Sequence, residues 1–204
     1  MNPGFKSAED SYKSISAPSK GLYKDKGSKF LSFAYPVSSE GQVKEIISDI
    51  KKEYFDARHH CYAYRIGHQG QLWRMNDDGE PSSTAGKPIY GQIVSNQLSD
   101  ILIVVVRYFG GILLGTSGLI VAYKAAAADA IANAAVVDKI ATIRCRAEFD
   151  YLQMNAVMKC LKDFQLTPQN TDYGNSCSLE VDVRLAREEE FLETMQKICI
   201  CQRV

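Results

Sequence analysis

The segment from Asp77 to Gly86 gathers side chains that could bind a ligand. It contains three carboxylates, three hydroxyls and two glycines, and loops of this content often carry binding sites. Carboxylates could take Mg²⁺ and hydroxyls could bind phosphate, whereas the same groups could serve only the hydrogen bonds of turns and a helix cap. The candidate loop residues are Asp77, Asp78, Gly79, Glu80, Ser83, Thr84 and Gly86.

Glycines separate a buried apolar run from an alanine-rich run in residues 104–119, VVVRYFGGILLGTSGL. The first N–H groups of a helix have no partner within it, so a glycine turn placed there can hold an anion. A steric role is the alternative, because glycine also permits a tight turn and close contact between helix and sheet. The candidates for ligand or anion binding are Arg107, Gly110, Gly111, Gly115, Thr116, Ser117 and Gly118.

Neither glycine-containing segment matches a common nucleotide-binding motif. The dinucleotide pattern G-x-G-x-x-G ending at Gly118 would require glycine where Leu113 stands. The P-loop pattern with Lys87 as its lysine would require glycine at Pro81 and a hydroxyl residue at Pro88. No nucleotide cofactor is therefore indicated.

Polar residues on a strand expected over residues 60–66 could line a cleft. Neighbouring residues of a strand point to opposite faces, so His59 and His60 cannot bind one metal ion, whereas His59 and Cys61 could share a face. No further well-spaced pair of Cys and His accompanies them. We therefore expect no catalytic residue, no metal and no cofactor. The cleft candidates are His59, His60 and Arg65.

The composition is that of an ordinary globular protein without net charge. Lys plus Arg and Asp plus Glu number 24 each, so any nucleic acid or anionic membrane must be met by a local basic patch. No apolar run reaches the roughly 18 residues of a membrane span, and the polar N-terminus has no signal-peptide core. The six cysteines form no C-x-x-C pair. We expect a cytoplasmic protein that does not associate with a membrane.

Strands and helices must position the candidate residues. The unbroken apolar run at residues 101–106 predicts a strand buried on both faces, and the alanine-rich run at 122–135 predicts a helix lying close to a sheet. Apolar residues at helical spacing predict a helix after Ser39, with Ser39 as its N-cap. Strands are also expected at residues 12–16, 29–37, 60–66 and 71–75, with turns at Gly21 and Gly27 and a helix over residues 84–97.

A new series of strand and helix patterns begins after residue 137, which indicates a second domain. We expect domains over residues 1–137 and 138–204. The order strand, helix, strand, strand, helix follows most of the ferredoxin-like plan, with a closing strand that is short or absent after Ile198. Its strands are expected at residues 143–149, 166–173 and 178–184, its helices around residues 152–164 and 191–198, and a turn at residues 174–175.

Three segments together resemble the IMPACT/YigZ family: ARHHCYAYRIG at residues 57–67, DDGEPSSTAGKPI at residues 77–89, and the glycine turn at residues 104–119. The resemblance covers residues 16–136 and is to the bacterial members, without the eukaryotic N-terminal partner-binding domain. It implies an α+β protein of two domains. The first would be a left-handed βαβ domain similar to domain IV of elongation factor G, and the second a ferredoxin-like domain similar to its domain V.

The resemblance also implies a role in translation or its regulation, since eukaryotic relatives regulate translation and associate with ribosomes. We expect a non-catalytic factor that binds the ribosome, RNA or a translation protein. One alternative is an enzyme or sensor that binds a phosphorylated small molecule, a small anionic ligand, between the Asp77–Gly86 loop and the Gly110–Gly118 turn. A protein-interaction scaffold is a third reading. The local basic patches considered for RNA are Arg58, Arg65, Arg107, Lys24 and Lys29.

Overall fold

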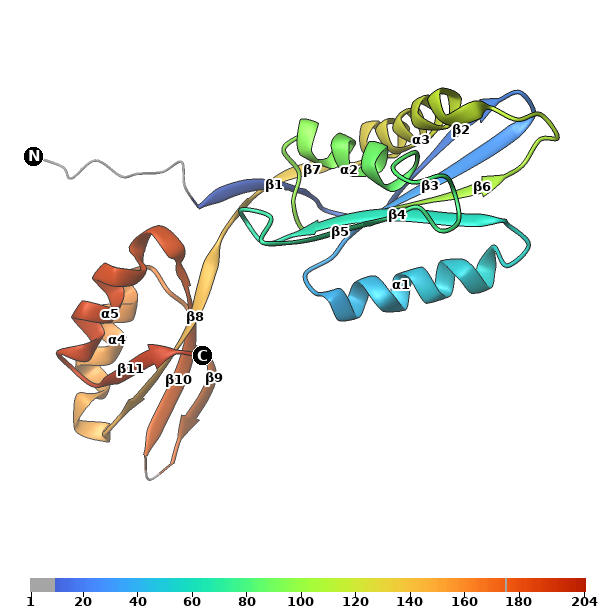
Figure 1. The fold of residues 1–204 in the computed structure, drawn as a ribbon. Helices are drawn as coiled ribbons and strands as arrows, with labels where there is room; N and C mark the ends of the chain where they lie inside the picture. The colour runs from blue at the N-terminus through green and yellow to red at the C-terminus, as the bar shows by residue number, and fades with distance from the viewer. Residues whose placement is uncertain (1–9, 175) are drawn as a thin grey trace, which may run out of the picture. The chain divides into compact units, whose positions relative to one another are not determined.

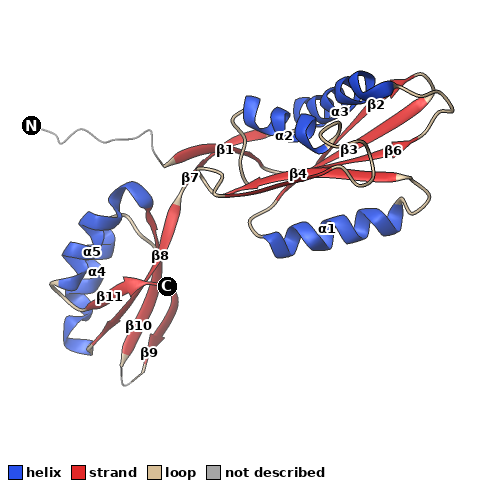
Figure 2. Cartoon of the chain, viewed as in Figure 1, coloured by secondary structure: helices blue, strands red, loops and turns tan. Residues whose placement is uncertain are grey.

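The structure is a computed structural model that describes residues 10–174 and 176–204. The chain divides into two compact units, one of residues 12–139 and one of residues 140–204 with Asp10 and Ser11. Each unit has its own β-sheet with helices packed on it (Figure 1), and strands and helices are mixed along the chain (Figure 2). The fold class is α+β.

The larger unit is built on one five-stranded sheet. In chain order its elements are β2 (Ser19–Asp25), β3 (Ser28–Pro36), α1 (Glu40–Glu53), β4 (His59–Ile66), β5 (Leu72–Asn76), α2 (Gly86–Ser95), β6 (Ile101–Tyr108) and α3 (Gly115–Ala132). The strand order is β2-β3-β6-β4-β5, and every neighbouring pair is antiparallel. Because β3 and β4 both pair with β6, they run parallel and α1 joins them. β5 and β6 are parallel for the same reason, with α2 between them, so the unit contains two βαβ crossings.

Strand β6 lies at the centre of this sheet and is buried on both faces. Ile103 and Val105 belong to the core shared with α2 and α3, whereas Leu102 and Val104 belong to the core on the α1 side. Figure 1 shows α1 on one side of the sheet and α2 and α3 on the other. The predicted strand is confirmed, and its continuous apolar sequence follows because neither face meets water.

Small residues allow α3 to lie close to β2 and β3. Ala126 and Ala130 are fully buried, and their carbonyl groups accept hydrogen bonds of 2.7 Å from Ser32 and Ser19. A Cβ atom at Gly21 would lie 2.4 Å from the backbone nitrogen of Ala130. The prediction that Gly21 marks a turn is therefore wrong. It lies within β2, where it leaves room for the helix backbone.

Helix α1 begins where the sequence predicts. The Ser39 hydroxyl accepts a hydrogen bond of 3.3 Å from the Gln42 backbone N–H, and the Gln42 side chain accepts one of 2.8 Å from the Ser38 backbone. The first bond satisfies a donor that the first helical turn leaves free, and the second holds the residue before the N-cap. Val43 and Ile50 then bury one face of the helix against the sheet.

Strands β1 (Ser11–Ile15) and β7 (Val136–Ile140) form a separate two-stranded sheet. The sequence predicts β1 but not β7, whose positions are all exposed or half-buried and carry little apolar pattern. Tyr12 of β1 donates a hydrogen bond of 2.5 Å to Asp100, and the same carboxylate accepts one of 2.8 Å from the Gly67 backbone. Asp100 thus links β1 to the β4–β5 hairpin.

The smaller unit has a four-stranded sheet with the ferredoxin-like order β11-β8-β10-β9. Its elements are β8 (Thr142–Phe149), the 3₁₀ turn η1 (Tyr151–Gln153), α4 (Met154–Asp163), β9 (Gln169–Tyr173), β10 (Cys177–Arg184), η2 (Leu185–Arg187), α5 (Glu188–Gln196) and β11 (Ile200–Arg203). The closing strand β11 does form: it has four residues and pairs with β8. Of the turn predicted at residues 174–175, residue 175 lies outside the described residues.

The carboxylate of Asp10 is bound within the smaller unit by residues far along the chain. It is 2% exposed, accepts hydrogen bonds of 2.7 and 2.9 Å from the Arg184 guanidinium, and accepts one of 3.1 Å from the Ala186 backbone. The bond from Arg184 is the main cause that lowers the pKa of Asp10, burial opposes it, and the Ala186 N–H assists it. Asp10 therefore belongs structurally to β10 and η2.

Candidate functional site

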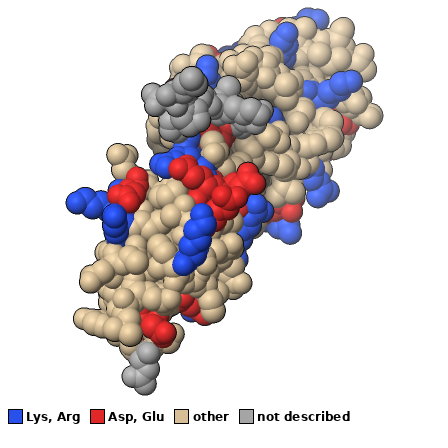
Figure 3. Space-filling model, turned by 90° about the vertical axis from the view of Figure 1, so that its left-hand side faces the viewer, with Lys and Arg blue, Asp and Glu red and all other residues tan. Residues whose placement is uncertain are grey.

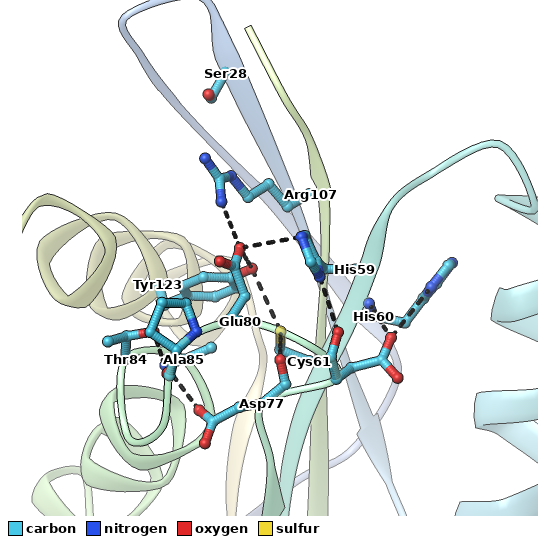
Figure 4. Close-up of polar contacts among 12 residues, drawn as sticks. Ser28, His59, His60, Cys61, Asp77, Glu80, Thr84, Ala85, Arg107 and Tyr123 are labelled. Carbon is cyan, nitrogen blue, oxygen red and sulfur yellow. Dashed lines mark hydrogen bonds and ion pairs between the residues drawn. The ribbon is translucent and has the colours of Figure 1, made fainter. Parts of the chain in front are cut away.

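Glu80 connects the loop of residues 77–86 to β6 and α3 (Figure 4). Its Oε1 lies 2.6 Å from Nη1 of Arg107, on β6, and accepts a hydrogen bond of 2.8 Å from the hydroxyl of Tyr123, on α3. The side chains of Glu80 and Arg107 are 4% and 7% exposed. They form a buried ion pair, in which loss of either partner would leave an uncompensated charge.

His59 extends this cluster from β4. Its Nε2 lies 3.9 Å from Oε1 of Glu80, and its Nδ1–H donates a hydrogen bond of 2.8 Å to the Asp78 carbonyl. Because a carbonyl only accepts, Nδ1 carries a proton, and Nε2 is the ring nitrogen that faces Glu80. The His60 ring donates instead to the Tyr54 carbonyl at 3.0 Å. The two rings thus have different partners and do not converge on one ion, as strand alternation predicts.

Cys61 is buried beside the same cluster and has no free thiolate. Its thiol donates to the Asp77 carbonyl at 3.0 Å and lies 3.3 Å from the hydroxyl oxygen of Tyr123. Burial raises the pKa of Cys61 well above its usual range, and burial likewise raises the pKa of Tyr123. Burial therefore disfavours the thiolate form, on which the reactivity of a cysteine depends.

The carboxylate of Asp77 holds the loop against the start of α2. It accepts hydrogen bonds of 2.9, 3.0 and 2.8 Å from the backbone N–H groups of Ser83, Ala85 and Gly86. Ala85, which stands at the N-cap, offers no capping side chain, so Asp77 supplies the cap from a distance. Asp77 thus closes the loop, which is one of the two roles that the sequence left open.

Asp78 makes a different set of contacts. It accepts hydrogen bonds of 2.7 Å from the His60 backbone N–H and 3.1 Å from the Lys51 ammonium. Burial by itself would raise the pKa of Asp78, but these two donors outweigh it and the pKa is lowered. Asp77 and Asp78 therefore bind separate partners within the protein and do not present a shared carboxylate pair.

The remaining loop candidates shape its backbone. Ser83 and Gly79 adopt positive φ angles of 64° and 86°, and the Thr84 hydroxyl donates a hydrogen bond of 2.7 Å to the Pro81 carbonyl. A Cβ atom at Gly86 would lie 2.8 Å from the backbone nitrogen of Asn76. These residues close the loop onto the end of β5.

The glycines after β6 divide into two kinds. A Cβ atom at Gly110 would lie 1.9 Å from the carbonyl carbon of Gly27, so the β2–β3 turn packs directly on Gly110. Gly111 and Gly115 have open space around them but positive φ angles of 87° and 70°. The first glycine is required by contact and the other two by backbone conformation. Gly118 is less constrained, since its Cβ would lie 3.0 Å from the Cβ of Leu114.

Helix α3 starts without a side-chain cap. Leu114 stands at its N-cap and provides no hydrogen bond to the first turn. Thr116 and Ser117 are exposed there. The first N–H groups of this 18-residue helix therefore have no side-chain acceptor at the N-cap.

Arg65 lies away from this cluster, at the opposite end of β4 from His59. Its guanidinium donates hydrogen bonds of 2.9 Å to the Leu98 carbonyl and 2.8 Å to the Gln69 carbonyl. Of the three cleft candidates, only His59 lies at the cleft described next.

A pocket of about 390 Å³ opens between the loop and the glycine turn. Arg58, His59, Glu80 and Arg107 form its polar side, with Thr116 at the start of α3. Its apolar side consists of Pro81, Phe109, Leu113, Leu114 and Leu119. Among the described residues there is no cluster of three or more His, Cys, Asp or Glu side chains arranged to hold a metal ion. Nor does any helix in the described ranges have both the length and the apolar character needed to cross a bilayer.

Comparison with known proteins places these residues in a family. Residues 26–131 match the family described as Impact N-terminal domain, which is more than half of the 204-residue chain. The chain belongs to the IMPACT family. It is 33% identical to IMPACT family member YvyE of Bacillus subtilis, over 84% of this chain and 79% of that protein. It is 32% identical to IMPACT family member YigZ of Escherichia coli, over 86% of this chain and 87% of that protein.

A solved structure also matches this IMPACT-family chain. A crystal structure described as that of a hypothetical protein is 29% identical, with a TM-score of 0.74, and the match covers 96% of this chain and 98% of that one. The family match at residues 26–131 runs from the β2–β3 turn to the end of α3 and includes every residue that lines the pocket.

Tyr123 is absent from the sequence-based candidates, and Arg58 was considered only as part of a basic patch for RNA, not as a residue of this pocket. Tyr123 is the single aromatic residue in the alanine-rich run of residues 122–135, and it is fully buried. A buried tyrosine hydroxyl usually has a hydrogen-bond partner, so its isolation among alanines was a usable signal for a polar contact on the sheet. The partner itself, Glu80, could not be read from the sequence.

Proposed function

We propose that this chain is a non-catalytic factor of translation or its regulation, acting in the cytoplasm by binding the ribosome, RNA or a translation protein. Membership of the IMPACT family is the observation that carries this proposal, because the match covers residues 26–131 and relatives match over most of the chain. The side-chain contacts agree with a binding role. Glu80, Asp77 and Asp78 are each engaged with cations or backbone N–H groups of the protein.

The surface best suited to a phosphate backbone is the β2–β3 hairpin. Lys24 and Lys29 lie directly opposite each other in its register, and both are exposed. Lys20 and Lys26 are exposed on the same hairpin, with Asp25 as its single carboxylate. Four ammonium groups within one hairpin form a local basic patch of the kind that binds RNA phosphates.

Two of the five basic residues considered from the sequence do not contribute to such a patch. Arg107 is buried against Glu80, and Arg65 is engaged with two backbone carbonyl groups. On the face shown in Figure 3, Lys and Arg side chains are interspersed with Asp and Glu. Affinity for RNA would therefore depend on the hairpin lysines and on the low salt concentration that favours their phosphate contacts.

Co-sedimentation of the full chain with ribosomes across a salt series tests this function. We expect association at low salt that weakens as the salt concentration rises. The double substitution Lys24→Gln with Lys29→Gln should reduce the steepness of the plot of log binding constant against log salt concentration by about 1.4 to 1.8. The matched control is Lys159→Gln with Lys162→Gln, which removes two exposed lysines from α4.

Two outcomes identify the partner, and a third rejects the proposal. Association that nuclease abolishes indicates RNA, whereas nuclease-resistant association with ribosomal or translation proteins indicates a protein contact. Absence of the chain from the ribosomal pellet and from translation-factor pull-downs at low salt would overturn the proposal.

A further inference from the structure

The pocket between the glycine turn and the loop of residues 77–86 has the size and the two-sided lining of a small-ligand site. Its volume of about 390 Å³ lies within the range of roughly 300–1,000 Å³ typical of such sites. Leu113, Leu114 and Leu119 provide an apolar wall, and Arg58 and Arg107 lie on the polar one. A ligand that fits both walls would have an apolar body and an anionic end.

Arg107 provides an observation that points to a missing acceptor. Its side chain is 7% exposed, and its hydrogen bond to Glu80 is made by Nη1. Within the described residues, Nε of Arg107 is buried and has no hydrogen-bond partner. Buried polar groups are nearly always paired, so an unpaired N–H on a guanidinium in a pocket wall indicates an acceptor supplied from outside the chain.

The start of α3 adds donors of a second kind. Gly115 and Thr116 line the pocket, and the N-cap residue Leu114 leaves the first N–H groups of the helix without a side-chain acceptor. Helix N-termini attract anions through these N–H groups and the helix dipole. The guanidinium in the wall and the helix start are independent features of one cavity.

The charges of the pocket also favour an anion. Glu80 balances the charge of Arg107. Arg58 is exposed and also lines the pocket, so these three side chains leave one net positive charge there. Three sets of donors, namely the helix start, Arg58 and Arg107, approach from different elements, which suits the three terminal oxygens of a phosphate better than the two of a carboxylate.

We propose that this pocket binds a small organic phosphate, with its phosphoryl group between the start of α3, Arg58 and Arg107, and its apolar body against Leu113, Leu114 and Leu119. Nε of Arg107 is enclosed in the ligand-free protein, so the proposal requires the guanidinium to turn toward the ligand on binding. Phe109, whose ring centroid lies 5.7 Å from the Arg107 guanidinium carbon, flanks the same site. This binding does not depend on association with the ribosome.

An NMR titration of the full chain tests the site with three probes. Phenyl phosphate carries both parts of the proposed ligand, inorganic phosphate carries only the head group, and phenol carries only the body. We expect saturable shifts of the Gly115 and Thr116 amides and of the Arg107 Nε–H, with phenyl phosphate binding at least about tenfold more tightly than either fragment. Equal affinity for phenyl phosphate and inorganic phosphate, or no saturation up to about 10 mM, would overturn the assignment.

Charge variants separate this site from non-specific anion binding. Arg58→Gln alters an exposed residue and should weaken phenyl phosphate binding roughly two- to fivefold. Glu80→Gln keeps an acceptor for Arg107 and Tyr123 while removing the negative charge, and should tighten binding. Lys159→Gln, on α4, should leave it unchanged. Unchanged affinity in Arg58→Gln, or an equal loss in Lys159→Gln, would contradict the proposal even if Glu80→Gln folded poorly.

Discussion

Oε1 of Glu80 lies 2.6 Å from Nη1 of Arg107, and both side chains are almost completely buried. The pair joins the irregular loop of residues 77–86 to β6, the most buried strand of the sheet. Tyr123 donates to the same carboxylate from α3. One carboxylate therefore holds three segments that are distant in the sequence.

Removing this carboxylate should destabilise the larger unit strongly. Glu80→Ala leaves the Arg107 charge buried without a partner and should lower the free energy of unfolding by about 3–5 kcal/mol. Glu80→Gln should lower it less, since a neutral acceptor remains. Urea unfolding followed by the fluorescence of Trp73, the single tryptophan of the chain, reports on this unit because Trp73 lies in β5. The double variant Glu80→Leu with Arg107→Met should recover much of the loss, and a double variant as unstable as Glu80→Ala would contradict the role of the buried Arg107 charge.

Two glycines should respond to alanine in opposite directions. Gly110→Ala places a Cβ 1.9 Å from the Gly27 backbone and should lower the free energy of unfolding by about 1–3 kcal/mol. Gly91→Ala is the matched control, because Gly91 lies in α2 with no atom within 4 Å of the added Cβ, and should raise it by about 0.5–1 kcal/mol. The same Trp73 measurement distinguishes them. A stable Gly110→Ala variant would mean that the β2–β3 turn can move away.

The contact between Asp10 and Arg184 should make the smaller unit sensitive to acid. The pKa of Asp10 is lowered in the folded state, so its stabilisation is complete above the unfolded pKa of about 3.8 and is lost as pH falls through the folded pKa. Carbon-13 NMR of the Asp10 carboxyl should show a pKa below 3.8, and Arg184→Gln should raise it. In thermal unfolding, Asp10→Asn should lower stability at neutral pH and flatten its dependence on pH below about 4. The control Asp163→Asn, at the exposed end of α4, should change neither the stability at neutral pH nor its dependence on pH. If Asp10→Asn left the loss of stability in acid unaltered, the role given to the Asp10 carboxylate would be contradicted.

The six thiols should react unequally with a disulfide reagent. Cys199 is the half-buried thiol, and burial raises its pKa to about 11, with the Cys160 thiol contributing. The other cysteines, including Cys61, are buried. In the native protein at pH 8 we expect one slow reaction, which Cys199→Ser abolishes, and reaction of all six thiols in denaturant. Rapid native-state labelling of Cys61 would show that its environment opens readily.

Local patterns were sufficient for the elements that the sequence predicts well. The unbroken apolar run of β6 and the N-cap at Ser39 depend on neighbours within a few residues, so a single segment contains the information. The two segments that bound the pocket were also identified, because their glycines and hydroxyls interrupt all periodicity.

Contacts between residues far apart in the sequence could not be predicted from local patterns. Glycine is a residue type that often marks turns, but the role of Gly21 is set by the close approach of the Ala130 backbone, which lies more than a hundred residues away in the sequence. Asp77 could have bound a metal, a phosphate or backbone N–H groups, and its residue type does not distinguish these partners. The partner of Tyr123 likewise became known only when the loop and the helix were placed together.

The position of Asp10 in the sequence determines which fragments of the protein keep the smaller unit whole. The smaller unit is discontinuous in sequence, since Asp10 and Ser11 belong with residues 140–204. A fragment expressed from residue 138 onward would lack Asp10 and leave the Arg184 guanidinium and the Ala186 N–H without their shared acceptor. A fragment that begins with residues 10–11 joined by a short linker to residue 140 would keep it, and should be the better starting point for isolating this unit.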